Sequence, residues 1–301
     1  MPELPDLTIY VDALAARVTG RLLRRFRISS PFLLRTFDPP ADACTGHSVT
    51  QVHRQGKRII LSLDNDTHLA FHLMIAGRFL WSDLSPPPSK PLGKIDLARL
   101  DFDTGSLTLT EAGTQKRASL HILAGQTALD TLDPGGLDPL TCTLPNFHLA
   151  LTRTNRTLKR ALTDPRTIAA VGNAYSDESL HAARLSPFKQ TQSLSDSDVC
   201  CLYESMQSVL NRWISTLRSE FGSRFPGVGD ITAFRPDFAV HGRYRLPCPV
   251  CRTPVQRVTY SGKNDLNYCP TCQTGGKVLA DRALSRLLRA DWPRTVANLD
   301  E

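Results

Sequence analysis

Four cysteines near the end of the chain form the strongest chemical signal in the sequence. They make two Cys-x-x-Cys pairs separated by seventeen residues: Cys248, Cys251, Cys269 and Cys272. Two such pairs at this spacing bring four thiolates to one tetrahedral site, the arrangement that a structural Zn²⁺ prefers. We therefore predict one structural zinc ion, in preference to disulfide bonds or a redox pair. The ion would hold a hairpin at about residues 256–268, which is too short to form a core of its own.

The N-terminus, which reads MPELPD over residues 1–6, is the second candidate for chemistry. If Met1 is removed, Pro2 becomes a free secondary amine. Such an amine can attack the aldehyde carbon of a sugar, and the neighbouring carboxylic acid of Glu3 can protonate a ring oxygen or a leaving group. The alternative interpretation is a disordered tail without a chemical role.

A glycine turn at residues 172–178, Gly-Asn-Ala-Tyr-Ser-Asp-Glu, is the third candidate. A turn of this kind that enters a helix presents free backbone N–H groups and the positive end of the helix dipole, which suits a phosphate. An ordinary helix start is the alternative. The phosphate interpretation gains weight from the basic residues that precede the turn, which are Arg153, Arg156, Lys159, Arg160 and Arg166.

The charge distribution predicts an anionic partner. The 301 residues include 36 Lys and Arg against 29 Asp and Glu, a net charge of +7. Residues 1–150 hold 15 of each sign, whereas residues 151–301 hold 21 basic and 14 acidic residues. Arginine supplies 28 of the basic residues, and its planar fork binds phosphate with two hydrogen bonds. We therefore expect nucleic acid rather than a membrane surface.

The composition is that of a globular protein, with 41% hydrophobic and 22% charged residues. These values exclude a disordered or collagen-like chain. No run approaches the roughly 20 apolar residues of a membrane span, and no basic-then-apolar leader opens the sequence. We expect a reducing cytoplasmic setting and no membrane partner.

Apolar periodicity indicates the elements that must position these residues. Helical spacing from Leu7 to Val18 predicts one helix that ends near Gly20. The rest of the first half predicts an antiparallel sheet, from apolar runs at 58–63, 69–80, 95–102 and 107–109. Within the run 69–80 we expect Ile75 to share a face with Leu73. The second half predicts helices at 147–163 and 176–184, and a longer helix that begins at Ser195.

In this order, the segments resemble the formamidopyrimidine-DNA glycosylase and endonuclease VIII family of base-excision enzymes. The resemblance covers residues 1 to about 274 and rests on five matches in register. These are the Pro-Glu-Leu-Pro start, a lysine within Gln-Gly-Lys-Arg at 55–58, the strand Phe-His-Leu at 71–73, the Gly-Asn turn at 172–173 and the four-cysteine finger.

The resemblance implies an α+β multidomain protein, a monomer associated with the nucleoid in the bacterial cytoplasm. It would have an N-terminal antiparallel β-sandwich with a leading helix, a helical helix-two-turn-helix domain and a C-terminal zinc-finger β-hairpin. The corresponding expected boundaries are a catalytic domain at 1–132, a linker at 133–146, the helical domain at 147–240, the finger at 241–274 and a basic helical tail at 275–301.

The resemblance also implies roles for individual residues. Pro2 would be the nucleophile at the sugar C1′ and Glu3 the general acid, with Lys57 and Glu178 completing the catalytic group. Lys57, His72 and Asn173 would hold phosphates around the damaged nucleotide. Taken singly, Lys57 also fits a solvated charge at a strand end, His72 a core histidine, and Glu178 a first-turn glutamate.

The activity implied is that of a bifunctional DNA glycosylase and abasic-site lyase on duplex DNA containing a damaged base or an abasic site. After the base is lost, a Schiff base at the N-terminal proline would lead to β- and δ-elimination. One alternative is a DNA-binding protein on the same scaffold that recognises unusual DNA without cutting it. A general zinc-ribbon RNA-binding or transcription factor is another alternative, but it leaves Pro2 and Glu3 unexplained.

The sequence departs from the family pattern in three places. The finger hairpin has Lys263 and Asn264 where family members that remove oxidised purines carry an arginine. Met74 or Ile75 can serve as the wedge that fills the gap in the DNA. The loop at 114–119 supplies Lys116 and Arg117 to DNA but no aromatic residue. The tail after residue 274 has an apolar stripe and a basic face, which predict packing and phosphate contact.

Overall fold

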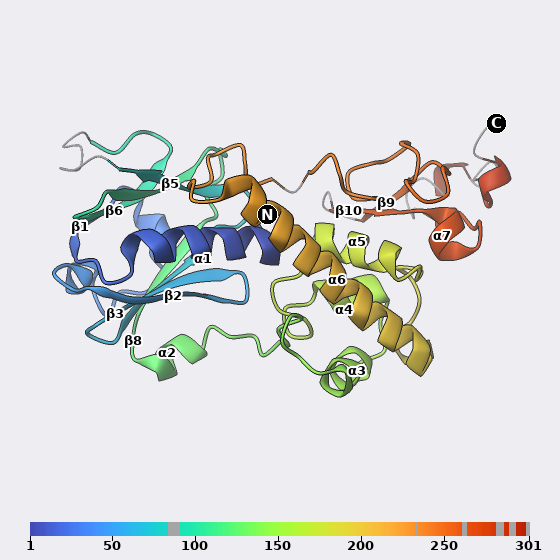
Figure 1. Cartoon of the computed structure of the whole chain (residues 1–301), viewed down its shortest axis with the longest axis horizontal. Coiled ribbons are helices and arrows are strands. Elements are labelled where there is room, and N and C mark those ends of the chain that lie inside the picture. The colour runs from blue at the N-terminus through green and yellow to red at the C-terminus, as the bar shows by residue number, and fades with distance from the viewer. Residues whose placement is uncertain (84–90, 233, 261–263, 281–285, 289–292, 299–301) are drawn as a thin grey trace. The chain divides into compact units, whose positions relative to one another are not determined.

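The computed structural model describes the chain apart from residues 84–90, 233, 261–263, 281–285, 289–292 and 299–301 (Figure 1). The chain forms two compact units. The first comprises Met1–Pro134 and Trp213–Thr232, and the second comprises Gly135–Arg212 and Ala233–Glu301. No described helix is both long enough and apolar enough to cross a bilayer.

Two four-stranded antiparallel sheets and helix α1 (Leu4–Val18) build most of the first unit. The first sheet has the order β1-β6-β7-β5 and consists of Leu23–Ile28, Asp96–Phe102, Ser106–Glu111 and Gly77–Ser82. The second has the order β2-β3-β4-β8 and consists of Val49–Gln55, Arg58–Leu63, Thr67–His72 and Ser119–Ala124. A short helix, α2 (Gln126–Asp130), follows β8. The predicted β-sandwich with a leading helix is confirmed.

One hydrophobic core joins α1 to both sheets. Apolar residues at every third or fourth position of α1 face this core, as the sequence predicts: Leu7, Tyr10, Leu14 and Val18. The Tyr10 ring meets Phe79 of β5 edge-on at 5.6 Å between centroids, and Phe79 meets Phe71 of β4 at 5.3 Å. Burial of each such side chain stabilises the fold by roughly 1.5–3 kcal/mol. The start of α1, where the N-terminal residues lie, is therefore held against both sheets.

The apolar run at 69–80 is two strands rather than one. Strand β4 ends at His72 and β5 begins at Gly77, and the two strands belong to different sheets. Between them Met74 has a left-handed backbone with φ of 53°, and Ile75 is 60% exposed. The expectation that Ile75 shares a buried face with Leu73 is therefore wrong, because the chain turns at Met74 to change sheets. The turn is closed by the Gly77 N–H, which donates to the Leu73 carbonyl at 2.9 Å.

Helices dominate the second unit. They are α3 (Leu144–Thr152), α4 (Leu158–Thr163), α5 (Asn173–Ala182) and α6 (Asp196–Phe221), the last of which ends in the first unit. The prediction of a single helix over 147–163 is wrong. Near residues 153–157 the backbone leaves helical geometry and pairs with a distant segment, since the Leu158 N–H donates to the Lys189 carbonyl at 2.9 Å.

The start of α6 is as the sequence predicts. Ser195 and Asp198 form a reciprocal cap, in which the Ser195 N–H donates to Asp198 Oδ2 at 2.8 Å and the Asp198 N–H donates to Ser195 Oγ at 3.2 Å. Two backbone donors at the helix start thereby gain partners.

The expected hairpin of the finger is present in the second unit. Strand β9 (Gln256–Tyr260) pairs antiparallel with β10 (Asn264–Tyr268), and the short helix α7 (Pro270–Thr274) follows. Leu279 packs beside the small apolar cluster of the hairpin. Two of the five residues of the predicted apolar stripe of the tail, Ala283 and Leu284, lie outside the described residues. Leu287 and Leu288 are exposed, at 77% and 38%.

We expect the Gly77→Ala substitution to destabilise the turn between β4 and β5. A Cβ at residue 77 would lie 2.3 Å from the Leu73 carbonyl oxygen, so the backbone must shift. The free energy of unfolding in urea should fall by about 1–3 kcal/mol. Gly229→Ala is the matched control, since a Cβ there meets no atom within 4 Å. Equal stabilities of the two variants would contradict the close approach.

Candidate functional site

The start of α1 holds the two N-terminal residues that the sequence singles out. Pro2 and Glu3 are both buried. Glu3 is the N-cap of α1: its N–H donates to Asp6 Oδ2 at 3.0 Å, and its carbonyl accepts from the Leu7 N–H at 2.9 Å. These bonds fix the backbone of Glu3, and therefore the direction in which the chain leaves toward Pro2 and Met1.

The N-terminal amine lies in an environment that favours its neutral form. Burial lowers the pKa of the Met1 amine, and the positive charges of Arg78 and Lys57 act in the same direction. The carboxylates of Glu3 and Asp6 oppose this shift. Arg78 was not among the residues singled out from the sequence, because only the turn before β5 brings it near the N-terminus.

Lys57 and His72 come together through strand pairing. Lys57 lies in the turn between β2 and β3, and Arg58, the next residue, pairs in register with His72 of β4. Burial, followed by the charges of Arg58 and Lys57, lowers the pKa of His72 to about 4. The Met74 N–H donates to His72 Nδ1 at 3.1 Å. The proton of the neutral ring is therefore on Nε2, which makes this nitrogen a hydrogen-bond donor.

Met74 and Ile75 lie at the tip of the β4–β5 turn. Arg78 braces this tip, since its Nη1 donates to the carbonyls of Ile75 at 3.0 Å and Gly77 at 2.7 Å. Ile75 projects to solvent, whereas Met74 is half-buried. The tip thus presents an apolar side chain beside the guanidinium that also acts on the N-terminal amine.

The loop that carries Lys116 and Arg117 is anchored by Glu111 at the end of β7. The buried Glu111 carboxylate accepts the N–H groups of Arg117 at 2.9 Å and Ala118 at 3.1 Å, through the same oxygen. Lys116 Nζ donates to the Glu111 carbonyl. Arg117 is exposed and donates to Gln115 Oε1 at 2.8 Å. Of the two basic side chains, Arg117 is the one that faces solvent.

The glycine turn of the second unit leads directly into α5, which begins at Asn173. Asn173 Nδ2 donates to the Asp265 carbonyl of β10 at 2.6 Å. The carboxylate of Glu178 is buried and accepts three backbone N–H groups, from Ala239 at 2.7 Å and from Val240 and His241 at 2.9 Å each. Burial raises the pKa of Glu178, and the three hydrogen bonds oppose that rise. Both residues thus connect α5 to later parts of the chain.

A buried ion pair on α5 was not identified from the sequence. Asp177 is fully buried; its Oδ1 accepts from Lys159 Nζ at 2.5 Å, and its Oδ2 lies 2.7 Å from His241 Nδ1. Lys159 Nζ also donates to the Asn173 carbonyl at 2.7 Å and to Ser176 Oγ at 2.8 Å. Lys159, one of the basic residues before the glycine turn, is therefore committed to the interior.

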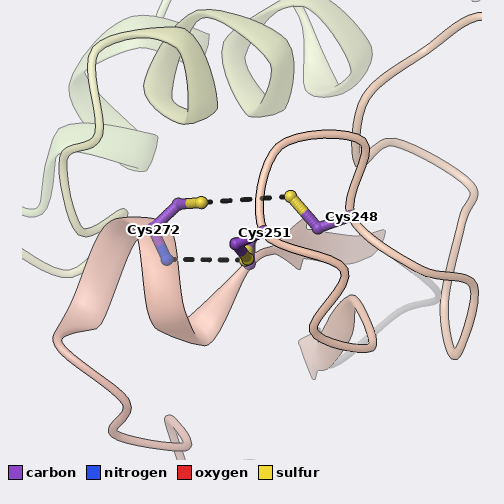
Figure 2. A group of neighbouring side chains, drawn as sticks. Cys248, Cys251 and Cys272 are labelled. Atoms are coloured by element: carbon purple, nitrogen blue, oxygen red, sulfur yellow. Dashed lines mark hydrogen bonds between the residues drawn. The ribbon is translucent and has the colours of Figure 1, made fainter.

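The four cysteines of the finger converge on one point. Their Sγ atoms all lie within 4.8 Å of one another. Figure 2 shows the thiol groups of Cys248 and Cys272 facing each other, with 3.9 Å between the sulfurs, and Cys251 and Cys269 are separated by 3.3 Å. A zinc ion bound at about 2.3 Å to four sulfurs in a tetrahedron separates them by about 3.8 Å. The donor set and its spacing therefore fit a metal ion, and the four ligands leave no open position for chemistry.

His181, on the last turn of α5, contacts this cluster. Its Nε2 lies 3.3 Å from Cys248 Sγ, and both side chains are buried. An imidazole N–H that donates to a thiolate offsets part of its charge and holds its direction, as outer-shell partners of metal ligands do. The sequence offered no signal for this contact, because His181 and Cys248 are far apart in the chain.

We expect the environment of His72 to make stability depend on pH. The folded protein protonates His72 only near pH 4, whereas an unperturbed histidine does so near 6.5. Between these values the unfolded chain binds more protons, so the free energy of unfolding decreases as the pH falls from 6.5 to 4. Urea titrations at several pH values should show a weaker dependence in His72→Gln than in the original protein. Parallel curves would contradict this assignment.

We expect the His181→Phe substitution to weaken metal binding in the zinc-loaded protein by about 10–100-fold. The measurement is the transfer of zinc to a chromogenic chelator at equilibrium. His181→Gln retains an N–H donor and should recover part of the affinity. His148→Phe on α3 is the control, since this side chain makes no hydrogen bond to the described residues. If His181→Phe and His148→Phe hold zinc equally well, the contact with Cys248 has no influence on the metal.

Comparison with known proteins agrees with the geometry of both units. The family model described as formamidopyrimidine-DNA glycosylase N-terminal domain matches residues 1–117, and the model of the H2TH domain of the same enzymes matches residues 136–223. A formamidopyrimidine-DNA glycosylase from Thermus thermophilus is 31% identical over 285 residues, which cover 92% of this chain and 100% of the relative. A protein from Mycobacterium tuberculosis, described as an uncharacterized formamidopyrimidine-DNA glycosylase-like protein, is 42% identical over 167 residues, 56% of this chain and 100% of that protein.

Solved structures show the same fold. The MutM (Fpg) protein from Thermus thermophilus superposes with a TM-score of 0.74 at 29% identity and covers 90% of this chain and 98% of that one. The Lactococcus lactis glycosylase bound non-covalently to DNA with an abasic site gives a TM-score of 0.76 at 22% identity, over 90% of this chain and 99% of that one. From the two domain matches and the full-length relatives, the chain belongs to the formamidopyrimidine-DNA glycosylase family.

Proposed function

We propose that the protein is a bifunctional DNA glycosylase and abasic-site lyase that acts on duplex DNA containing a damaged base or an abasic site. The environment of the N-terminal amine carries this proposal. Burial and the charges of Arg78 and Lys57 lower the pKa of the Met1 amine. Pro2 is buried next to it, so the amine that replaces that of Met1 enters surroundings that favour a neutral amine, which is the nucleophilic form. Membership of the glycosylase family supports the same reaction.

The chemistry begins after Met1 is removed, when the amine belongs to Pro2, which is itself buried. The damaged nucleotide leaves the base stack so that its C1′ can reach this amine. The Pro2 nitrogen forms a bond to C1′ as the base departs with the bonding electrons, and the N–H proton of Pro2 passes to the departing base. Glu3 donates a proton to the sugar ring oxygen as the ring opens. The result is a Schiff base in the form of an iminium ion between the Pro2 nitrogen and C1′.

Strand cleavage then follows from the acidity of the C2′ proton in the Schiff base. Loss of that proton expels the 3′ phosphate, and a second elimination expels the 5′ phosphate. Water finally hydrolyses the bond between Pro2 and C1′ and frees the amine. Zinc, when bound to the four cysteines, supplies structural support to the hairpin and takes no part in these steps.

The remaining candidate residues hold DNA. Lys57 and His72 bind phosphates beside the damaged nucleotide, since one carries a charge and the other presents a neutral Nε2–H donor. Asn173 does the same from the glycine turn. Glu178, whose carboxylate accepts the backbone N–H groups of residues 239–241, assists the reaction together with Lys57. Met74 or Ile75 enters the gap left by the displaced nucleotide, and the apolar tip of the β4–β5 turn suits this role. Lys116, Arg117, Lys263 and Asn264 contact the backbone or the opposite strand.

A second candidate is a protein that binds unusual DNA on this scaffold without cutting it. Two observations favour it. The loop with Lys116 and Arg117 contains no aromatic residue, and Lys116 Nζ is already bonded to the Glu111 carbonyl. Lys263, which replaces the arginine of the finger, lies outside the described residues. Both candidates share the DNA partner and differ only in the reaction of the N-terminal amine.

The two candidates are separated by trapping with borohydride. The zinc-loaded protein, with Met1 removal verified by mass spectrometry, is incubated with duplex DNA that contains an abasic site. We expect a covalent protein–DNA adduct, because borohydride reduces the Schiff base at Pro2 to a stable amine. Substitution Pro2→Gln, which retains Met1 and removes the secondary amine, should reduce the adduct to background.

The control is Pro145→Ala, which removes an exposed proline from the first turn of α3 and leaves the N-terminus unchanged. Its adduct should form at the original rate. Tight binding of abasic DNA by the zinc-loaded protein without any adduct would contradict the enzyme proposal. It would support the second candidate, a protein that binds unusual DNA without cutting it.

A further inference from the structure

Four arginines of the second unit surround one open cavity. Its volume is about 450 Å³, and its lining consists of Arg153, Thr154, Arg156, Arg160 and Arg166. These residues lie at the end of α3, in α4 and in the segments beside α4. All four arginines precede the glycine turn, but none is among the residues assigned a DNA contact above. Lys159, the fifth basic residue of the group, is buried against Asp177 instead.

Asp164 holds two of the guanidinium groups in place. Arg156 Nη1 donates to Asp164 Oδ2 at 2.6 Å, and Arg166 donates through Nε and Nη2 to both carboxylate oxygens at 3.1 Å each. The hydrogen bonds from Arg166 and Arg156 lower the pKa of Asp164 despite its partial burial, so the carboxylate stays charged. Fixed guanidinium groups lose less side-chain entropy when a ligand binds.

The other two arginines of the cavity have no compensating charge. Arg153 and Arg160 are exposed, and no carboxylate among the described residues lies within ion-pair distance of either. Asp164 therefore balances one of four positive charges around the cavity. Like charges gathered in a concave site attract an anion more strongly than the same charges spread over a surface.

The lining also restricts the class of anion. Guanidinium forks and a threonine hydroxyl match the oxygens of phosphate, and no aromatic ring lines the cavity to stack on a base. The base of a free nucleotide would find no stacking partner in this cavity. The backbone of a nucleic acid presents phosphates to the cavity and requires no such partner. The cavity is open to solvent, as a site for a continuous strand must be, and the half of the chain that contains it holds the entire charge surplus.

We propose that this arginine cavity binds backbone phosphates of duplex DNA without regard to sequence, in addition to the contacts around the damaged nucleotide. The inference rests on the proposed function only in that DNA is the partner; it does not require the reaction at Pro2. The cavity would prolong residence on undamaged DNA, where phosphate contacts dominate affinity.

The test is the salt dependence of binding to an undamaged duplex, measured by fluorescence anisotropy on the zinc-loaded full chain. The double variant Arg153→Ala with Arg160→Ala removes the two arginines that make no ion pair, so folding should be preserved. Each phosphate contact contributes about 0.9 to the slope of log K against log salt concentration, so the slope should fall by about 2.

The matched control is Arg24→Ala with Arg25→Ala, two exposed arginines of β1 in the first unit. This double variant changes the net charge by the same amount, and its slope should equal that of the original protein within experimental error. Equal slopes for the two double variants would overturn the proposal, whether or not borohydride trapping succeeds. Failure of the original protein to bind undamaged duplex would overturn it as well.

Binding of inorganic pyrophosphate distinguishes a site for small free anions from a site for backbone phosphates of DNA. Calorimetry with pyrophosphate on the original protein and on the Arg153→Ala, Arg160→Ala variant reports any such binding. A site for backbone phosphates predicts two results. Pyrophosphate competes only weakly with DNA, and the Arg153→Ala, Arg160→Ala variant shows the smaller slope of log K against log salt concentration. Tight pyrophosphate binding that the variant loses, with no change in the DNA slope, would assign the cavity to a free anion and contradict the proposal.

Discussion

The buried carboxylate of Asp177 is the constraint on which the second unit depends. Both of its oxygens are removed from water, and a buried charge without partners costs several kcal/mol. Lys159 of α4, His241 and the Asn267 N–H of β10 supply those partners at 2.5, 2.7 and 3.1 Å. Segments distant in sequence must therefore meet at one helix, and removal of Lys159 would take away the cation that pairs with the buried carboxylate.

The other polar residues of α5 extend this attachment along the helix. Asn173, Asp177 and His181 follow one another at intervals of four residues, so they lie on one face. They bind, in order, the Asp265 carbonyl, the Asn267 N–H and the Cys248 thiol. One helix thus holds both the hairpin and the cysteine cluster, and its N-terminus is the glycine turn proposed to bind phosphate.

The first unit depends on burial of its N-terminus rather than on a buried ion pair. Helix α1 packs with both sheets in one core, and its cap at Glu3 fixes the last backbone bonds before the amine. Arg78 at the start of β5 and Lys57 in the turn before β3 act with their positive charges on the Met1 amine at that end of the helix. The half of the chain with no net charge therefore carries two cations near the N-terminus proposed to react.

The sequence by itself determined the features that arise from local patterns. The apolar period of α1, the hairpins, the Ser195 cap and the four-cysteine motif each depend on residues close together in the chain, and each is present in the structure. The same patterns indicated the family, although the roles of individual site residues stay predictions.

Only the tertiary structure decided where a continuous sequence pattern divides into two elements and which charged side chains are buried. The run at 69–80 divides because its two halves pair with strands of different sheets, and the helix expected at 147–163 breaks where Leu158 bonds to Lys189. Of five similar basic residues before the glycine turn, Lys159 is buried by Asp177 while four arginines line a cavity. Apolar spacing records which face of an element is buried, but the partners of a charge come from segments distant in sequence.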